Sequence, residues 1–166
     1  MKTVYLMRHA KSTWEFPELK DEERPLIEKG IKRTKKIIKF LNVKKVKPDI
    51  IISSHAVRAQ ETAKLMAKGL DCPLNEIVID EKVYESNIEN LFNIIYGIPN
   101  DKNTMIMIGH NPTITNFANY FLTEYVDYMP TSGVVCVEFD TDKWNEIVTA
   151  KKQTRFIIYP KMLKSV

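Results

Sequence analysis

Val4-Tyr5-Leu6-Met7-Arg8-His9 decides the fold class. A short apolar run that ends abruptly in charged and polar residues is typical of a buried strand in an α/β sheet. Residues 105–110, Met-Ile-Met-Ile-Gly-His, repeat the pattern 101 positions further along the chain. A third apolar run, Ile50-Ile51-Ile52, leads through two serines toward Arg58. The sequence therefore predicts three buried strands, each followed directly by polar side chains.

The same edge of the sheet is expected to collect these polar residues. Ligands of open α/β sheets bind beyond the carboxyl ends of the strands. We expect His9 and His110 to lie at that edge, and Arg8 directly precedes His9. An arginine paired with a histidine indicates an anionic substrate and a histidine that acts as a base or nucleophile.

Strands and helices alternate along the chain, which predicts a largely parallel sheet covered on both faces, a three-layer α/β/α sandwich. The order expected is strand 2–8, helix 26–42, strand 49–53, helix 56–70, strand 77–80, helix 87–96, strand 104–108, helix 112–123, strand 134–139 and a last strand near 154–158.

Length and composition agree with one globular domain over residues 1–166. A chain of this size buries about 70% of its unfolded surface, and 44% hydrophobic with 28% charged residues is ordinary for a soluble protein. We expect a cytoplasmic monomer. No apolar stretch reaches the ~18 residues of a membrane span, and Arg8 interrupts the first apolar run too early for a signal peptide. Cys72 and Cys136 are expected to be reduced structural thiols.

The net charge of +4 raises the question of nucleic acid. Six basic residues crowd the helix expected at 26–42 and three more follow it. Its core face needs Ile31, Ile38 and Leu41, which leaves the lysines in solvent. No aromatic residues are interleaved with them as stacking platforms, so nucleic-acid binding is not expected.

Four motifs in order resemble the histidine phosphatase superfamily, also called the phosphoglycerate-mutase-like fold. They are Arg8-His9-Ala10-Lys11-Ser12, the segment from Asp21 to Gly30 that contains Arg-Pro-Leu, the serine-rich strand end from Ser53 to Ala63, and Gly109-His110-Asn111-Pro112. The resemblance spans nearly the whole chain. The chain also resembles the SixA-type branch in its compactness, in the segment Met129–Gly133 and in the Pro160-Lys161 ending. That branch is associated with the dephosphorylation of phosphohistidine on signalling proteins.

The resemblance implies a role for each matched residue. His9 is the nucleophile that takes the phosphoryl group, and His110 is the second histidine of the pocket. Arg8 and Arg58 bind the phosphoryl oxygens, and nearby guanidinium groups favour a neutral nucleophile. Ser12 matches a hydroxyl position that touches phosphate. No cofactor is implied, and a metal site is not expected because the histidines lack the His-Glu spacing of zinc motifs.

Glu85 is the candidate general acid. It lies in Val83-Tyr84-Glu85, similar to the Leu-x-Glu context of many relatives, and could protonate a leaving alkoxide. The alternative is that Glu85 only faces solvent or assists the start of the next helix.

Departures from the family pattern concern three positions. Ala10 replaces a glycine, and Glu15 lies where many mutase-type relatives carry an asparagine that holds phosphate. His55 stands where the family often has proline and could either reach substrate or remain a surface residue.

The expected function is a metal-independent phosphatase that works through a phosphohistidine intermediate. The preferred substrate is a phosphohistidine protein, because the short chain leaves little room for a helical cap over the pocket. The alternatives are a phosphatase for a small phosphate ester and a catalytically silent phosphate-binding or adaptor protein.

Overall fold

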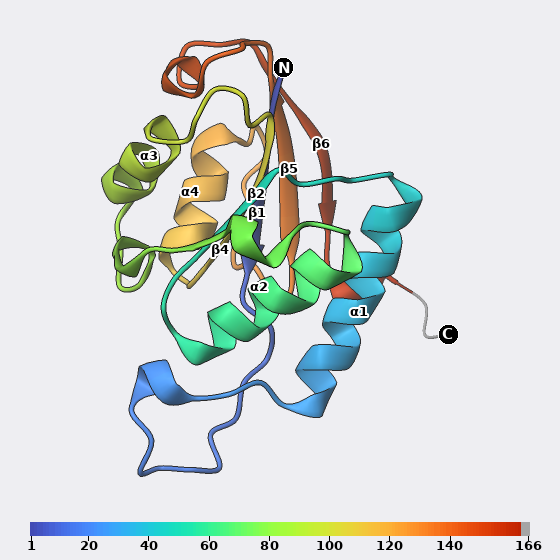
Figure 1. Cartoon of the computed structure of the whole chain (residues 1–166), viewed down its shortest axis with the longest axis vertical. Helices are drawn as coiled ribbons and strands as arrows, with labels where there is room; N and C mark the ends of the chain where they lie inside the picture. Colours follow the sequence, from blue (N-terminus) through green and yellow to red (C-terminus); the bar gives the residue numbers. More distant parts are fainter. Residues whose placement is uncertain (164–166) are drawn as a thin grey trace.

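The computed structural model of the chain describes residues 1–163, and its helices and strands follow the predicted order (Figure 1). Each predicted element is present, with ends that differ by at most two residues. The elements are β1 (Lys2–Arg8), α1 (Glu28–Val43), β2 (Ile50–Ser53), α2 (Val57–Gly69), β3 (Ile77–Ile79), α3 (Ile88–Tyr96), β4 (Thr104–Gly109), α4 (Thr113–Phe121), β5 (Val134–Phe139) and β6 (Lys152–Ile158).

One six-stranded sheet forms the middle layer, in the order β3-β2-β4-β1-β5-β6. The first four of these strands are parallel to one another, whereas β5 runs antiparallel to both β1 and β6. The predicted mostly parallel sheet is confirmed. The strands that carry the three principal motifs, β2, β4 and β1, are direct neighbours, so their carboxyl ends lie side by side.

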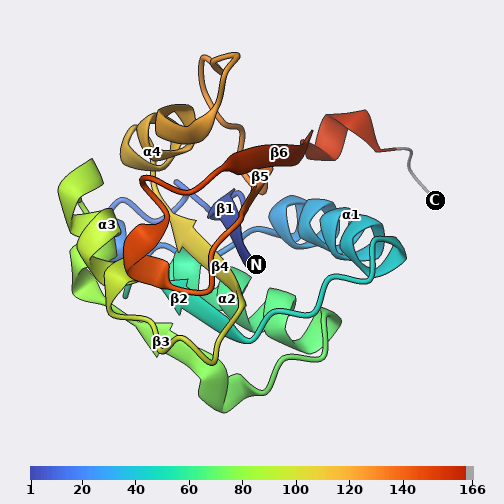
Figure 2. The ribbon, with the colours of Figure 1, turned by 90° about the horizontal axis from the view of Figure 1, so that it is seen from above.

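Helices cover both faces of the sheet, which confirms the three-layer architecture. Figure 2 shows α3 and α4 on one side and α1 and α2 on the other. Each face has its own apolar cluster. Successive side chains of a strand point to opposite faces, so Leu6 packs under α4 while Tyr5 and Met7 pack toward α1 and α2.

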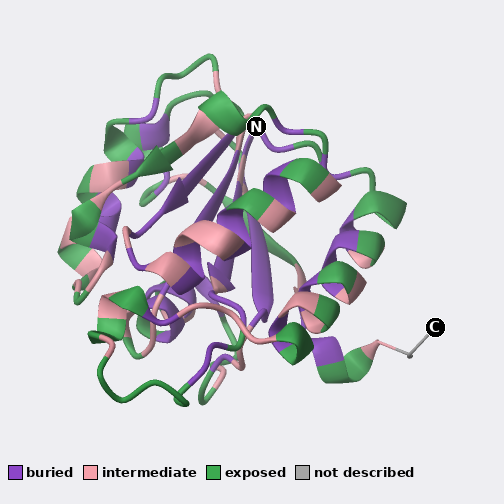
Figure 3. Ribbon diagram, turned by 60° about the horizontal axis from the view of Figure 1, so that its bottom comes forward, coloured by how far each residue is buried: buried purple, intermediate pink, exposed green. Residues whose placement is uncertain are grey.

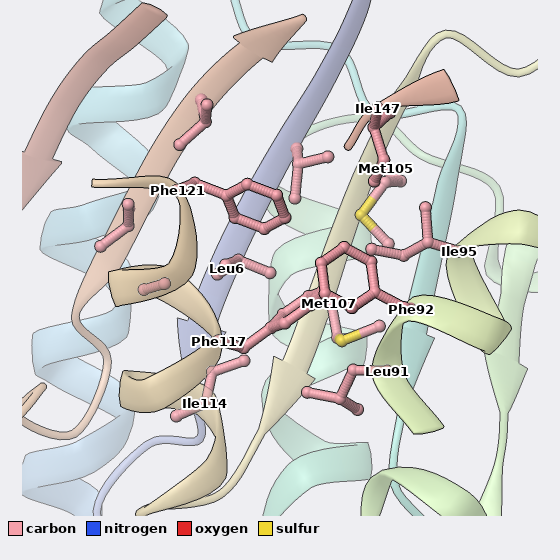
Figure 4. Close-up of a cluster of buried hydrophobic side chains, with 14 of the residues drawn as sticks. Leu6, Leu91, Phe92, Ile95, Met105, Met107, Ile114, Phe117, Phe121 and Ile147 are labelled. Carbon is pink, nitrogen blue, oxygen red and sulfur yellow. The ribbon is translucent and has the colours of Figure 1, made fainter. Parts of the chain in front are cut away.

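The larger cluster lies under α3 and α4 (Figure 4). Phe92 and Phe117 meet edge to face there, with ring centroids 4.9 Å apart, above Leu6 and Met107 of the sheet. The central strands are accordingly almost wholly buried, while the outward helix faces are exposed (Figure 3). Such packing holds the strand ends in fixed positions.

Helix α1 presents its lysines to solvent as expected. Lys29, Lys32, Lys35 and Lys39 are exposed, and the buried side is built on Thr34, Ile37, Ile38 and Leu41. Ile31 is only half-buried, so the core face lies slightly round the helix from the predicted one.

The loop between β1 and α1 crosses the carboxyl end of the sheet, at the bottom of Figure 1. Gly30 lets α1 approach this loop closely, since a Cβ there would lie 2.4 Å from the Lys11 carbonyl oxygen. The loop is therefore held against the first turns of α1. Within residues 1–163, no helix combines the length and the apolar character needed to cross a bilayer.

Candidate active site

His9 is the residue around which the site is built. It directly follows β1, and its backbone N–H donates to the Gly109 carbonyl at 3.1 Å. The ring Nδ1 lies 2.7 Å from the Ala10 carbonyl oxygen. A carbonyl can only accept, so Nδ1 carries the proton and Nε2 keeps a lone pair. The backbone thus selects the tautomer in which Nε2 keeps a lone pair that faces the site.

Arg58 lies next to that lone pair. Its Nε donates to His9 Nε2 at 3.4 Å, and its side chain is almost completely buried at the start of α2. One turn further along, the Thr62 hydroxyl donates to the Arg58 carbonyl and accepts from the Ala10 N–H. Thr62 thus connects the loop that carries His9 to the helix that carries Arg58.

His110 faces His9 from the end of β4, with ring centroids 5.0 Å apart. Its Nδ1 lies 3.4 Å from Arg58 Nη2, and its Nε2 lies 2.6 Å from the Ser54 hydroxyl. A guanidinium can only donate, so Nδ1 accepts and Nε2 donates to Ser54. Both histidines are then neutral, and Arg58 contacts each of them.

Burial lowers the pKa of both histidines to about 3. For His9, the charges of Arg58 and Arg8 add to the effect of burial, while the Ala10 carbonyl opposes it. For His110, the His9 ring and Arg58 act in the same direction as burial. Neutral imidazoles at pH 7 are what a nucleophilic ring nitrogen requires.

Arg8 and Ser12 line the same cavity as the two histidines. Arg8 is half-buried and donates through Nη1 to the Met129 carbonyl at 3.1 Å. The Ser12 hydroxyl accepts from Arg24 Nη1 at 2.8 Å, so its own proton can be donated to another group. Both side chains thus carry donors at the wall of the pocket.

The cavity has a volume of about 570 Å³, and no acidic side chain of the described residues 1–163 lines it. It brings together Arg8, His9, Ser12, Arg58 and His110, the residues that the sequence motifs single out. It is also lined by Lys11, Trp14, Arg24, Arg33, Asn111, Tyr128, Pro130 and Thr131. Over both groups of lining residues, five side chains are lysine or arginine, and such an environment is suited to a phosphoryl group.

Glu85 is placed beside this cavity and not in it. It is exposed, has a positive φ of 48°, and lines a second hollow of about 370 Å³. That hollow shares Arg58, His110 and Asn111 with the first cavity. An exposed carboxyl next to the site agrees with both hypotheses for Glu85, the general acid and the solvent-facing residue.

The residues that depart from the family pattern take no part in the main cavity. Glu15 and His55 do not line it. The His55 ring packs on Tyr84, with centroids 5.0 Å apart, and Tyr84 in turn packs on His110 at 5.2 Å. Ala10 is completely buried, with an ordinary backbone conformation.

Asp21 is the participant that sequence reasoning missed. Its carboxylate accepts from Arg58 Nη2 at 3.0 Å, Arg24 Nη2 at 2.9 Å and the Tyr84 hydroxyl at 2.5 Å, and its carbonyl accepts from Arg58 Nη1 at 2.6 Å. Burial raises the pKa of this carboxyl, but the hydrogen bonds from Tyr84, Arg58 and Arg24 outweigh burial and hold it well below its usual range. Asp21 thus joins three segments of chain around Arg58.

Two further residues of the site, Ser54 and Arg24, were not predicted as site residues. Both lie inside the motifs that resemble the superfamily, and this is the signal that could have found them. Among residues 1–163, no group of three or more His, Cys, Asp or Glu side chains is placed to hold a metal ion.

Curated proteins with related sequences include two from distant organisms. An uncharacterized chloroplastic protein of Arabidopsis thaliana is 33% identical over 119 residues, which cover 66% of this chain and 54% of that protein. The chain thus matches about half the length of this relative. An uncharacterized protein of Mycobacterium leprae is 28% identical over 115 residues, covering 68% of each.

Solved structures of SixA proteins share the fold. A protein histidine phosphatase SixA complexed with tungstate gives a TM-score of 0.82 at 18% identity, over 98% of this chain and 99% of that one. SixA from Agrobacterium tumefaciens gives 0.81 at 24% identity, over 96% and 98%. The fold is therefore phosphoglycerate-mutase-like, as the sequence motifs predicted. The family model of the histidine phosphatase superfamily, branch 1, matches residues 4–94, more than half of the sequence, and the chain belongs to this superfamily.

Proposed function

We propose that this protein is a phosphatase that forms a covalent phosphohistidine on His9 and acts on phosphohistidine in other proteins. The observation that carries the proposal is the unprotonated Nε2 of His9. The Ala10 carbonyl fixes this tautomer, and Nε2 accepts a long hydrogen bond from Arg58 in a cavity that no acidic side chain among residues 1–163 lines.

The reaction has two displacements at phosphorus. In the first, the lone pair of His9 Nε2 forms the N–P bond while the bond from phosphorus to the leaving group breaks, and the leaving group keeps that electron pair. In the second, a water oxygen attacks phosphorus and gives up one proton to the surrounding water. The N–P bond breaks, its electrons return to Nε2, and inorganic phosphate leaves.

Positive charge around the cavity supports these steps. Phosphoryl transfer depends mainly on positioning and on stabilising the charge of the equatorial oxygens. Arg8 and Arg58 can offer planar pairs of donors to those oxygens. His110 contributes its Nε2 proton if a phosphoryl oxygen replaces Ser54 as the acceptor.

The proposed substrate class follows from the leaving group and the cavity mouth. The imidazole of phosphohistidine leaves readily once protonated, so it does not need a carboxyl in contact with the histidines. At the mouth, Trp14 and Tyr128 are 78% and 60% exposed and stack against Arg24 and Arg8. Exposed tryptophan and tyrosine side chains are among the types that dominate the binding energy of protein interfaces.

A small phosphate ester is the second candidate. Its alkoxide leaving group needs a proton, and Glu85 lines the hollow that adjoins the cavity. A phosphate-binding protein without catalysis is the third. Metal independence, one domain over residues 1–166, a monomeric state and a cytoplasmic location remain predictions alongside these functions.

One assay separates the candidates. A phosphohistidine protein, an alkyl phosphate and a chromogenic aryl phosphate are each offered with and without a chelator. The proposal expects turnover of the first that is unaffected by chelation and lost in His9→Ala. A preference for the alkyl ester would favour the second candidate, and binding without turnover would favour the third.

A further inference from the structure

A third cavity, which we call the extension, adjoins the one that contains His9. Its volume is about 460 Å³, and it lies between α1, the loop at 130–131 and the chain after β6. It is lined by Arg33, Lys36, Pro130, Thr131, Tyr159, Pro160, Lys161 and Leu163. Arg33, Pro130 and Thr131 line both cavities, so the two cavities lie side by side and share a wall.

The lining of this extension is cationic. Arg33, Lys36 and Lys161 contribute three basic side chains, and among residues 1–163 no acidic side chain lines either cavity. Neither Arg33 nor Lys161 forms an ion pair with an acidic residue among residues 1–163. A groove lined with one sign of charge attracts ligands of the opposite charge.

A lysine-rich surface could be explained by solubility alone, and Lys35 and Lys39 on the exposed side of α1 fit that explanation. Solubility does not explain the position of Arg33 and Lys36, because both are half-buried and face a concave surface next to the catalytic cavity. Their position allows them to contact a substrate whose phosphoryl group lies at His9.

We propose that this extension binds acidic side chains adjacent to the phosphohistidine in the substrate protein. The proposal rests on the proposed function and specifies its substrate class. Basic groups spread along a concave surface suit carboxylates spread along a polypeptide, and the half-buried Tyr159 and Leu163 offer apolar surface for the chain between them. Surface ion pairs contribute modestly, so two or three of them should favour an acidic substrate on the order of 5-fold.

The test compares phosphohistidine peptides that differ only in the residues beside the phosphohistidine, which are acidic, neutral or basic. Wild-type protein should show the highest kcat/KM on the acidic peptide, and high salt should reduce that preference. In R33Q/K161Q the ratio of acidic to neutral should fall toward one. The charge-reversal variant R33E/K161E should prefer the basic peptide, a change that a folding defect cannot produce.

The matched control is K35Q/K39Q, which removes two charges from the same helix outside both cavities and should keep the acidic preference. Equal turnover of the three peptides by wild-type protein would overturn this inference and leave the proposed function intact. Hydrolysis of an aryl phosphate but of none of the peptides would overturn both. A preference confined to a sugar bisphosphate over its monophosphate would assign the extension to a small molecule and overturn the acidic-segment proposal.

Discussion

The Asp21 carboxylate lies 3.0 Å from Nη2 of Arg58, while Nε of the same guanidinium donates to Nε2 of His9. An acid in the loop after β1 therefore fixes the orientation of the arginine that faces His9. Asp21 is a positioning residue in this account, because it reaches the reacting atoms only through Arg58.

Replacing Asp21 with Asn should lower kcat by about 10-fold to 100-fold, the scale expected for a slightly misplaced catalytic group. KM should not rise, because the cavity loses no positive charge. Steady-state kinetics on an aryl phosphate tests both expectations. Glu22→Gln in the same short turn is the control, and an increase of KM at constant kcat would contradict the positioning role.

Arg58 should be more sensitive than Asp21. Arg58→Ala should cost on the order of 10²–10³ in kcat, comparable to removing an oxyanion donor. Arg58→Lys should recover little of this loss, since an ammonium cannot contact His9, His110 and Asp21 together. The same assay measures both variants, and near-wild-type activity in Arg58→Lys would show that only the charge matters.

The two buried histidines should make the protein less stable in acid. Their pKa values are about 3 when folded, against an ordinary value near 6.5 when unfolded. Between these values the unfolded chain binds more protons, so the free energy of unfolding should rise as pH increases from about 3 to 6.5. Above that range this contribution should be constant.

Denaturant unfolding of wild-type protein and His110→Gln over that range measures the effect. The variant lacks one of the two groups, so its free energy of unfolding should depend less steeply on pH. Identical slopes would mean that His110 is not held neutral by the fold.

Glu85 separates the two substrate classes. Glu85→Gln should slow hydrolysis of an alkyl phosphate by roughly 10²–10⁴ if Glu85 protonates the leaving alkoxide. The same change should affect phosphohistidine hydrolysis far less. Glu81→Gln, an exposed neighbour that lines neither cavity, is the control. Small equal effects on both substrates would leave Glu85 as a surface residue, and large equal effects would weaken the preference for phosphohistidine.

Local patterns in the sequence were sufficient to predict the fold. Apolar runs such as Val4–Met7 identify buried strands, and residues placed directly after them must lie at the sheet edge. His9, Arg8 and His110 were found in this way, and Arg58 lies one residue inside the helix that follows its strand.

Contacts between distant segments could not be predicted in the same way. Asp21 reaches Arg58 and Tyr84 across 37 and 63 positions of sequence. Asp21 is acidic and begins a single 3-10 turn, Asp21–Glu23, in the connection between β1 and α1. Neither hydrophobic period nor strand order fixes the position of so short a turn. Glu85 has a positive φ of 48°, and the sequence pattern does not predict this backbone conformation.

The most direct test of the central claim is the site of the covalent phosphoryl group. Wild-type protein mixed with a phosphorylated substrate is quenched rapidly in alkali, where phosphohistidine survives, and its peptides are analysed by mass spectrometry. The account predicts one acid-labile phosphoryl group on the peptide that contains His9 and none in His9→Ala, which should also be inactive. A phosphoryl group on any other residue, or full turnover by His9→Ala, would contradict it.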